Sequence, residues 1–184
     1  PAAKRKSLLR DLSGLLSRVD WLVESLLKMS SMDAGTVSFS PSRVSAKELI
    51  SKASSPVLIP MELREQNLRV HLDREDATLF VDPSWTEEAL SNVLKNCMEH
   101  TPAGGTIEIF CRQTTLFTEI IVEDDGPGFA ADDIPHLFER FYKGKNATEN
   151  SIGIGLALSR MIVTRENGTL KAENKPSGGA RFVF

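Results

Sequence analysis

Cysteines and long apolar runs are scarce in this chain of 184 residues. The two cysteines, Cys97 and Cys111, lie within apolar patterns and not at the spacings of metal ligands or redox pairs. We therefore expect no disulfide framework and interpret both as small core residues of a protein in a reducing compartment. Charged residues interrupt every apolar run well before the ~18 residues that a membrane-spanning helix needs, and no signal peptide is recognisable.

An excess of basic residues is also missing. The 22 lysines and arginines are outnumbered by 25 acidic residues, which gives a net charge of -3. A protein that binds nucleic acid regardless of sequence needs a basic face, so this function class is disfavoured. With 41% hydrophobic and 26% charged residues, the composition is that of a soluble globular protein and argues against a disordered or fibrous chain. The length predicts one domain of ~150 residues with an appendage.

The appendage is predicted to be a long N-terminal helix over residues 4–32, ending near Gly35. Apolar residues alternate at spacings of four and three, as in the seam of a coiled coil or helix bundle: Leu8, Leu12, Leu15, Val19, Leu22, Leu26 and Met29. A second apolar row beside this seam favours packing against several helices: Leu9, Leu16, Val23 and Leu27. The helix either pairs with other helices or folds back onto the globular domain, and the width of the stripe does not distinguish the two.

The rest of the chain is predicted to be an α+β fold. Apolar alternation predicts strands at residues 68–72, 78–81, 106–111, 118–123, 169–172 and 181–184. Helices are predicted at residues 45–53, 87–98 and 159–166, the first within a serine- and proline-containing hinge over residues 36–60. Because this order is not a regular βαβ alternation, we expect a two-layer α/β sandwich with a mixed, mainly antiparallel sheet and helices on one face.

Four short motifs place polar or flexible residues next to apolar segments. Asn92 and Asn96 share one face of a helix, and their side-chain oxygens suit Mg²⁺. Asp124 ends a strand before Gly126 and Gly128, where a carboxylate is able to accept a hydrogen bond from an amino group such as that of adenine. Taken singly, these motifs are equally well explained as a hydrated helix edge and a plain turn.

The other two motifs lie further along the chain. Residues 137–145, here called the lid segment, combine aromatic and basic residues that are able to reach a polyphosphate, and a polar stretch follows over residues 146–151. Gly153 and Gly155 lead into an apolar helix, whose free N–H groups form a natural phosphate site. Alone, a solvated loop and a tight turn explain them as well.

In this order, the four motifs closely resemble the N, G1, F and G2 boxes of sensor histidine kinases. These kinases belong to an ATPase superfamily that also includes DNA gyrase and the mismatch-repair ATPases. The resemblance implies that residues 36–184 are a catalytic ATP-binding domain. It also implies that residues 1–35 are the second helix of the dimerisation and phosphotransfer hairpin, whose first helix carries the acceptor histidine.

The resemblance assigns a role to each matching position. Asn92 and Asn96 are expected to hold Mg²⁺ against the triphosphate of ATP, and Asp124 to pair with the adenine amine in a turn shaped by Gly126 and Gly128. In the lid segment, Phe138 and Phe141 match anchoring aromatics, while Arg140 and Lys143 match basic positions near the phosphates. Further nucleotide contacts are expected from Glu99, His100, Gly153, Gly155 and Leu156.

Four positions depart from the family pattern or select among its branches. Ser151 replaces a glycine, Glu99 a frequent lysine and Ala180 a frequent threonine, but no primary ligand is lost. Hydrolysing branches have a water-activating glutamate where this chain has Asn92, so we expect phosphoryl transfer and not hydrolysis.

The resemblance therefore implies an ATP-dependent protein-histidine kinase with ATP and Mg²⁺ as its cofactors. The resemblance places the acceptor on the first hairpin helix, before residue 1, and none of His71, His100 and His136 lies on that helix, so the acceptor is expected outside this chain and autophosphorylation is not expected. The expected partners are a response regulator receiver domain and a second copy of the chain, bound through residues 8–29, with no nucleic acid and no membrane contact. The expected location is cytoplasmic, as the intracellular part of a membrane-anchored receptor.

Two other functions remain open at this point. The first is a nucleotide-binding regulatory module without kinase activity, which the residues Glu99 and Ser151 motivate. The second is an ATP-hydrolysing member of the same superfamily, which Asn92 disfavours.

Overall fold

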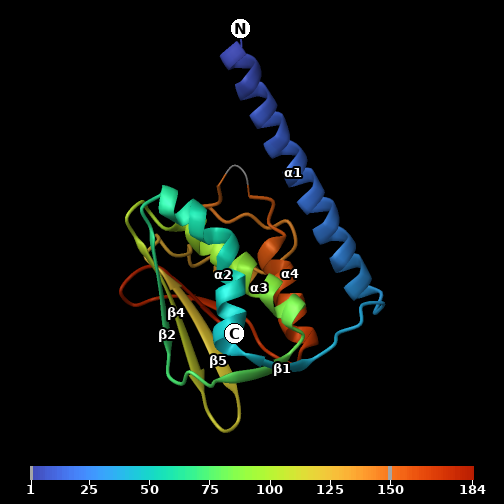
Figure 1. Ribbon diagram of the computed structural model, residues 1–184, viewed down its shortest axis with the longest axis vertical. Helices are drawn as coiled ribbons and strands as arrows, with labels where there is room; N and C mark the ends of the chain where they lie inside the picture. Colours follow the sequence, from blue (N-terminus) through green and yellow to red (C-terminus); the bar gives the residue numbers. More distant parts are fainter. Residues whose placement is uncertain (1, 149–150) are drawn as a thin grey trace. The chain divides into compact units, whose positions relative to one another are not determined.

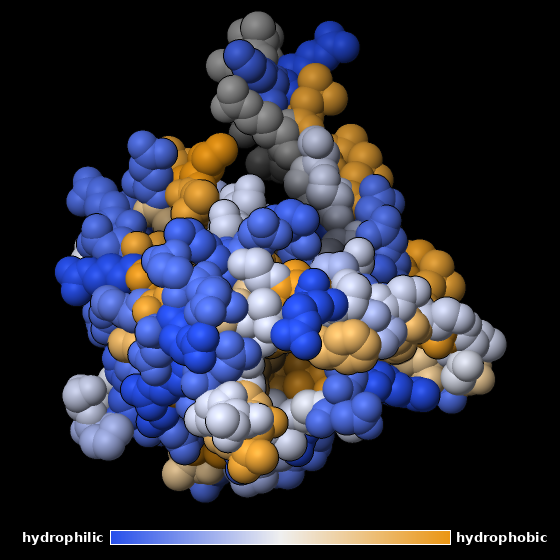
Figure 2. Space-filling model, turned by 60° about the horizontal axis from the view of Figure 1, so that its bottom comes forward, coloured by the Kyte–Doolittle hydropathy of each residue, from blue (hydrophilic) through white to orange (hydrophobic). Residues whose placement is uncertain are grey.

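The computed structural model describes residues 2–148 and 151–184, and the chain divides into two units, Pro1–Ser38 and Phe39–Phe184. The first unit is helix α1 (Ala2–Asp33), as predicted. It closes at Gly35, which has a φ of +67° and donates its N–H to the Met32 carbonyl at 3.0 Å. Apolar side chains remain exposed along this helix (Figure 2). Leu15 is 56% exposed and Val19 54%.

The second unit is built on a five-stranded sheet with the order β2-β4-β5-β7-β6 (Figure 1). The strands are β2 (Asn67–Leu72), β4 (Thr106–Gln113), β5 (Thr118–Asp124), β6 (Lys171–Asn174) and β7 (Ala180–Val183). Within the described residues, β2 and β4 pair in parallel and the other neighbours in this sheet are antiparallel. The mixed, mainly antiparallel sheet expected from the sequence is therefore confirmed.

Three helices cover one face of this sheet: α2 (Ala46–Leu63), α3 (Pro83–His100) and α4 (Gly155–Arg165) (Figure 1). Alternate residues of β4, including Ile107 and Ile109, are fully buried, as are Val93 and Leu94 of α3. The core therefore lies between the sheet and the helices. Both cysteines are free and buried in this core, as predicted.

The predicted hinge over residues 36–60 is wrong for much of its length. Strand β1 (Ser42–Ser45) pairs antiparallel with β3 (Thr78–Val81) to form a second, two-stranded sheet. Its polar sequence has no apolar alternation, so only the pairing with β3 defines it as a strand.

Helix α2 is twice as long as the predicted helix near residues 45–53, because it continues through Pro56 and Pro60 to Leu63. Each proline removes a backbone donor, which normally breaks a helix. Here Ala53, Val57 and Met61 continue a buried row at a spacing of four residues. Burial of this row offsets the lost hydrogen bonds.

Two further helices begin earlier than predicted. Helix α3 starts at Pro83 and not at residue 87, because the Asp82 side chain caps it by accepting from Ser84 N at 3.0 Å and Trp85 N at 3.3 Å. Helix α4 starts at Gly155 and not at residue 159. A short 3-10 turn, η1 (Ile134–His136), precedes the lid segment. No helix in the described part of the chain has the length and apolar character to span a membrane.

Candidate nucleotide-binding site

Two asparagines lie one turn apart on α3. Asn92 and Asn96 are half-buried, whereas Val93 and Cys97 beside them belong to the core. The Asn92 side-chain nitrogen is buried and has no hydrogen-bond partner within the described residues. A buried polar atom in this state carries a desolvation cost that a ligand or an ordered water would relieve. The side-chain oxygens of both residues are ligands of the type that Mg²⁺ accepts.

Asp124 stands at the end of β5 and is only 2% exposed. Its Oδ1 atom accepts two backbone hydrogen bonds, from Gly126 N at 2.8 Å and from Ala180 N at 3.0 Å. These bonds fix the orientation of the buried carboxylate.

Cys97 lies close to this carboxylate. Burial, and then the nearby negative charge of Asp124, raise the pKa of the Cys97 thiol well above its ordinary value. The thiol therefore stays protonated and is not a nucleophile. Cys97 is therefore a core residue next to Asp124.

The turn after β5 needs glycine at two positions because other elements approach it closely. A Cβ atom on Gly126 would lie 2.9 Å from both Asp124 Oδ1 and the His100 carbonyl oxygen. Gly128 has a φ of +71°, and a Cβ atom there would lie 2.6 Å from Asn174 Oδ1. The turn thus brings His100, Asp124 and Gly126 together at the end of α3.

Two residues that hold this turn are absent from the sequence-based prediction. Asn174 of β6 accepts from Phe129 N at 2.7 Å and donates to the Phe129 carbonyl at 2.8 Å. Gly179 has a φ of +94°, and a Cβ atom there would collide with the Asp124 carbonyl oxygen. The adjacent glycines Gly178 and Gly179 are a local sequence signal for the close approach to Asp124. Asn174 has no such signal in the sequence around it.

The start of α4 faces Asn92. Ile154, at the N-cap position of α4, makes no capping side-chain hydrogen bond, and a Cβ atom on Gly155 would lie 3.7 Å from Asn92 Cβ. The first N–H groups of a helix have no partner within it, and the helix dipole makes this end positive. Leu156 follows in the first turn and is half-buried. The structure therefore places the start of α4 beside Asn92, whose side-chain nitrogen has no hydrogen-bond partner among the described residues.

The lid segment is attached to this helix end through its backbone. The Phe141 N–H donates to the Gly153 carbonyl at 2.7 Å. Gly153 has a φ of +75°, and a Cβ atom on it would collide with the Tyr142 carbonyl oxygen. Glycine is therefore the residue that permits this contact.

The side chains of the lid segment are anchored unequally. Phe138 is half-buried, and the Arg160 guanidinium lies 4.8 Å from its ring centre. Phe141 is 57% exposed and has a φ of +65°, so its expected anchoring role stays a prediction. Arg140 contacts α4 through Met161 Sδ at 3.4 Å, and Lys143 is exposed. Residues 149–150 of the polar stretch that follows lie outside the described residues.

The end of α3 is fixed from the loop before β2. Arg64 Nη1 and Gln66 Nε2 each donate to the Met98 carbonyl at 3.0 Å, and Gln66 Nε2 also donates to the Thr101 carbonyl at 2.6 Å. These bonds satisfy carbonyls that the helix itself leaves open. Glu99 and His100 are half-buried at this end.

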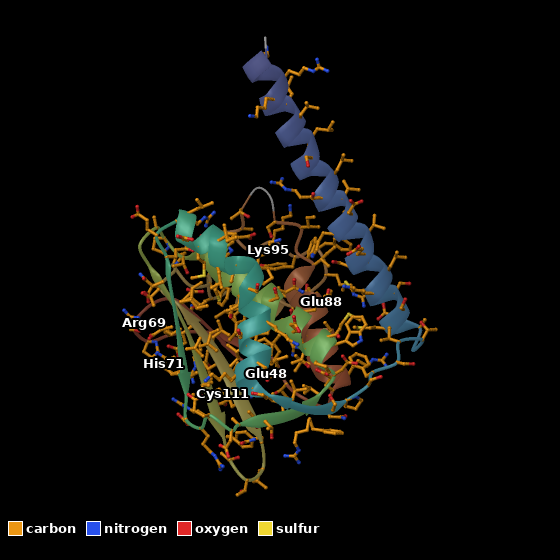
Figure 3. The ribbon with its side chains drawn as sticks, in the orientation of Figure 1. Glu48, Arg69, His71, Glu88, Lys95 and Cys111 are labelled. Carbon is orange, nitrogen blue, oxygen red and sulfur yellow. The ribbon has the colours of Figure 1, made fainter. Side chains whose placement is uncertain are left out.

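His71 is not part of this arrangement. Figure 3 shows it on β2 together with Arg69, and its ring contacts β4 through Glu108 Oε1 at 3.1 Å and Phe110 at 4.8 Å between ring centres. Among the described residues, no group of three or more histidine, cysteine, aspartate or glutamate residues is placed to hold a metal ion. A metal at the α3 site would therefore depend on the asparagines.

Comparison with known proteins agrees with this geometry. Residues 81–184 match the family described as Histidine kinase-, DNA gyrase B-, and HSP90-like ATPase. Sensor protein KdpD of Clostridium acetobutylicum is 30% identical over 189 residues, which include 98% of this chain and 20% of KdpD. This chain thus spans about a fifth of the length of that relative.

Two solved structures share the fold. Histidine kinase AdeS of Acinetobacter baumannii superposes with a TM-score of 0.81 at 20% identity, over 96% of this chain and 81% of that one. Histidine kinase ThkA, in its complex with response regulator protein TrrA, superposes with a TM-score of 0.76 at 21% identity, over 94% of this chain and 48% of that one.

Proposed function

Because the chain belongs to the family of histidine kinase-, DNA gyrase B- and HSP90-like ATPases, we propose that it is the catalytic part of a sensor histidine kinase. In this proposal, residues 36–184 bind Mg-ATP and transfer its γ-phosphoryl group to a histidine outside residues 1–184. A response regulator aspartate then receives the group. The relative named sensor protein KdpD, and the complex of the similar kinase ThkA with the response regulator TrrA, support a signalling role with such a partner.

The observation that carries the proposal is the uncapped start of α4 beside Asn92. Open N–H groups and the positive end of the helix dipole favour phosphate oxygens at Gly155. The unpartnered Asn92 amide faces the same point. One ligand with several phosphates would offer acceptor oxygens both to these N–H groups and to the Asn92 amide nitrogen.

The base of the nucleotide is assigned to the other end of α3. The Asp124 carboxylate is held by two backbone donors and presents its second oxygen to the amine of adenine. Guanine has a carbonyl at the corresponding position, which this carboxylate would repel. The site should therefore select adenine over guanine nucleotides.

The residues of α3 fit a magnesium ion. Asn92 and Asn96 offer two neutral oxygens on one face, and Mg²⁺ takes its remaining ligands from phosphates and water. When bound, Mg²⁺ neutralises charge on the transferring phosphoryl group. The protein contributes position: Asp124 orients the base, the start of α4 orients the phosphates, and Arg140 and Lys143 supply positive charge.

Residues 1–35 are proposed to be one helix of the dimerisation hairpin, with self-association through residues 8–29. The exposed apolar side chains along α1 support this role, because contiguous apolar surface seldom remains uncovered.

Nucleotide binding is tested by calorimetry of ATP with and without Mg²⁺, on the wild type, Asp124→Asn and the control Asp125→Asn. Asp125 is the next residue after Asp124. Its side chain is 52% exposed and pairs with Lys175, and it takes no part in the proposed contact with the adenine amine. We expect Mg²⁺-dependent binding in the wild type and in D125N. The loss of one charged hydrogen bond should weaken binding to D124N by about 10- to 100-fold.

Equal affinity of D124N and the wild type would contradict the assignment of the adenine pocket.

Phosphotransfer is then tested with radiolabelled ATP and a supplied hairpin that carries an acceptor histidine. Labelling of the hairpin supports the kinase, whereas nucleotide binding without labelling supports a regulatory module.

A further inference from the structure

A buried carboxylate outside the residues described so far organises the lid segment. Asp133 precedes η1 and is only 5% exposed. Its Oδ1 atom accepts from the Tyr142 hydroxyl at 2.8 Å, and its Oδ2 atom accepts from Lys145 N at 2.8 Å. One side chain therefore binds two points of the lid segment, one through a side chain and one through the backbone.

The chain closes tightly around this carboxylate. A Cβ atom on Gly144 would lie 2.7 Å from Asp133 Oδ2, so glycine permits the backbone to pass there. The Asp133 N–H donates to the Ala130 carbonyl at 2.9 Å, which fixes the backbone of Asp133 itself. The contact is thus part of a folded turn and not a surface pair.

The lid segment has a second attachment on its other side. The bond from Phe141 N to the Gly153 carbonyl joins it to the residues just before α4. Arg140 and Lys143 flank this bond, and Lys143 lies between the two residues held by Asp133. The backbone that carries both cations is therefore held at two places.

The charges at Asp133 favour this arrangement near neutral pH. The bonds from Lys145 N and from the Tyr142 hydroxyl lower the pKa of the Asp133 carboxyl, with smaller contributions from the charges of Lys145 and His136. The hydrogen bond between the Tyr142 hydroxyl and Asp133 also raises the pKa of Tyr142. The acceptor stays ionised and the hydroxyl keeps its proton.

We propose that Asp133 is a positioning residue that holds Arg140 and Lys143 at the phosphate end of the nucleotide site. This role rests on the proposed function, because it requires a nucleotide with phosphates beside α4. Asp133 touches no part of the nucleotide itself. It lowers the cost of binding by ordering the basic segment before the ligand arrives.

The test uses three variants of the full chain. Asp133→Asn keeps the shape but removes the charge and turns a donor toward Tyr142 or Lys145 N. Tyr142→Phe removes one of the two bonds. The matched control is Asp132→Asn, which removes an adjacent carboxylate that is 85% exposed and paired only with the Lys145 side chain among the contacts described, at 3.2 Å.

Dissociation constants are measured for Mg-ATP and for adenosine, and thermal unfolding confirms that each variant folds. We expect D133N to weaken the binding of ATP by at least about tenfold, as the loss of a charge-assisted bond predicts. The affinity for adenosine should be unchanged. Y142F should weaken ATP about threefold, in line with the loss of a single hydrogen bond. D132N should stay within about twofold of the wild type for both ligands, as expected for an exposed ion pair.

Equal losses for ATP and adenosine would show a general structural role and overturn the proposal. So would unchanged ATP affinity in a folded D133N, or in Y142F if D133N does not fold. A wild type that binds neither ligand would overturn the proposed function as well, which separates the two failures.

Discussion

Single residues in this protein depend on partners that are distant in the sequence. Glu166, which follows α4, accepts from Asp82 N at 2.7 Å and from the Thr86 hydroxyl at 2.8 Å. It thereby joins the end of one helix to the start of another. Burial raises the pKa of Glu166 above its ordinary 4.5, with the charge of Asp82 as a smaller cause, although its two hydrogen bonds oppose the shift.

This raised pKa predicts a pH-dependent stability. The folded state binds the Glu166 proton more tightly than the unfolded state, so the contribution is fully present below pH 4.5 and is lost as the pH rises through the folded pKa. The free energy of unfolding of the wild type, relative to Glu166→Gln, should therefore increase as the pH falls from 7 toward 4.5. Urea unfolding at several pH values measures this difference.

The control for this experiment is Glu75→Gln, an exposed carboxylate paired with Lys47 at 2.6 Å. The difference in the free energy of unfolding between the wild type and Glu75→Gln should not rise as the pH falls. A flat difference for Glu166→Gln would refute the effect of burial.

At the same scale, the sequence reveals some members of the site and hides others. Asp124 and Gly153 stand out because a strand end or a glycine interrupts an apolar pattern. Asp133 has no such signal, since an aspartate before a turn is usually a solvated residue. Asn174 acts on Phe129, 45 positions away, and only the strand order brings the two together.

At the scale of elements, helix starts depend on side chains just outside the periodic pattern. The Asp82 carboxylate caps α3 through Ser84 N and Trp85 N and also accepts from Ser40 N at 2.8 Å. The corresponding cap of α2, Ser45, makes one long bond to Glu48 N at 3.4 Å. The two caps differ in the number and the length of their bonds.

This difference predicts unequal effects of the same substitution. Asp82→Ala should lower the free energy of unfolding by about 1–2 kcal/mol, the upper part of the range for helix caps. Ser45→Ala should cost less than about 0.5 kcal/mol, because its bond is long. Thermal and urea unfolding of both variants provide the comparison, and similar losses would contradict the ranking.

Most elements follow from periodicity, but two do not. Strands β2 and β4 alternate apolar and polar residues, and all five strands of the main sheet lie within about two residues of their predicted positions. The second half of α2 is hidden by Pro56 and Pro60, which normally end a helix. Strand β1 is hidden because its identity depends on β3, a segment more than 30 residues away.

At the scale of the whole molecule, the exposed stripe of α1 predicts self-association. We expect light scattering to give a mass of twice 20.3 kDa for the wild type. The double substitution Leu15→Glu and Val19→Glu places charges in the stripe and should give the monomer mass, because it makes burial costly.

Leu116→Glu is the control, since Leu116 is 89% exposed in the turn between β4 and β5. It should leave the mass of the assembly unchanged. A monomeric wild type at all concentrations would refute self-association through residues 8–29.

The arrangement of layers is predictable at this scale, whereas the order of strands is not. The irregular succession of strands and helices predicts helices on one face of a mixed sheet. It does not indicate that β7 lies between β5 and β6. Local patterns determine which face of a strand is buried, but not which neighbour it takes.

The interior position of β7 has a consequence for synthesis on the ribosome. Among the described residues, strand β6 pairs with β7 alone, so it stays unpaired in the nascent chain until residues 180–183 have emerged. Ala180, which bonds to the Asp124 carboxylate, emerges in the same interval. Translation products that stop before this strand therefore have an open sheet and an incompletely held Asp124.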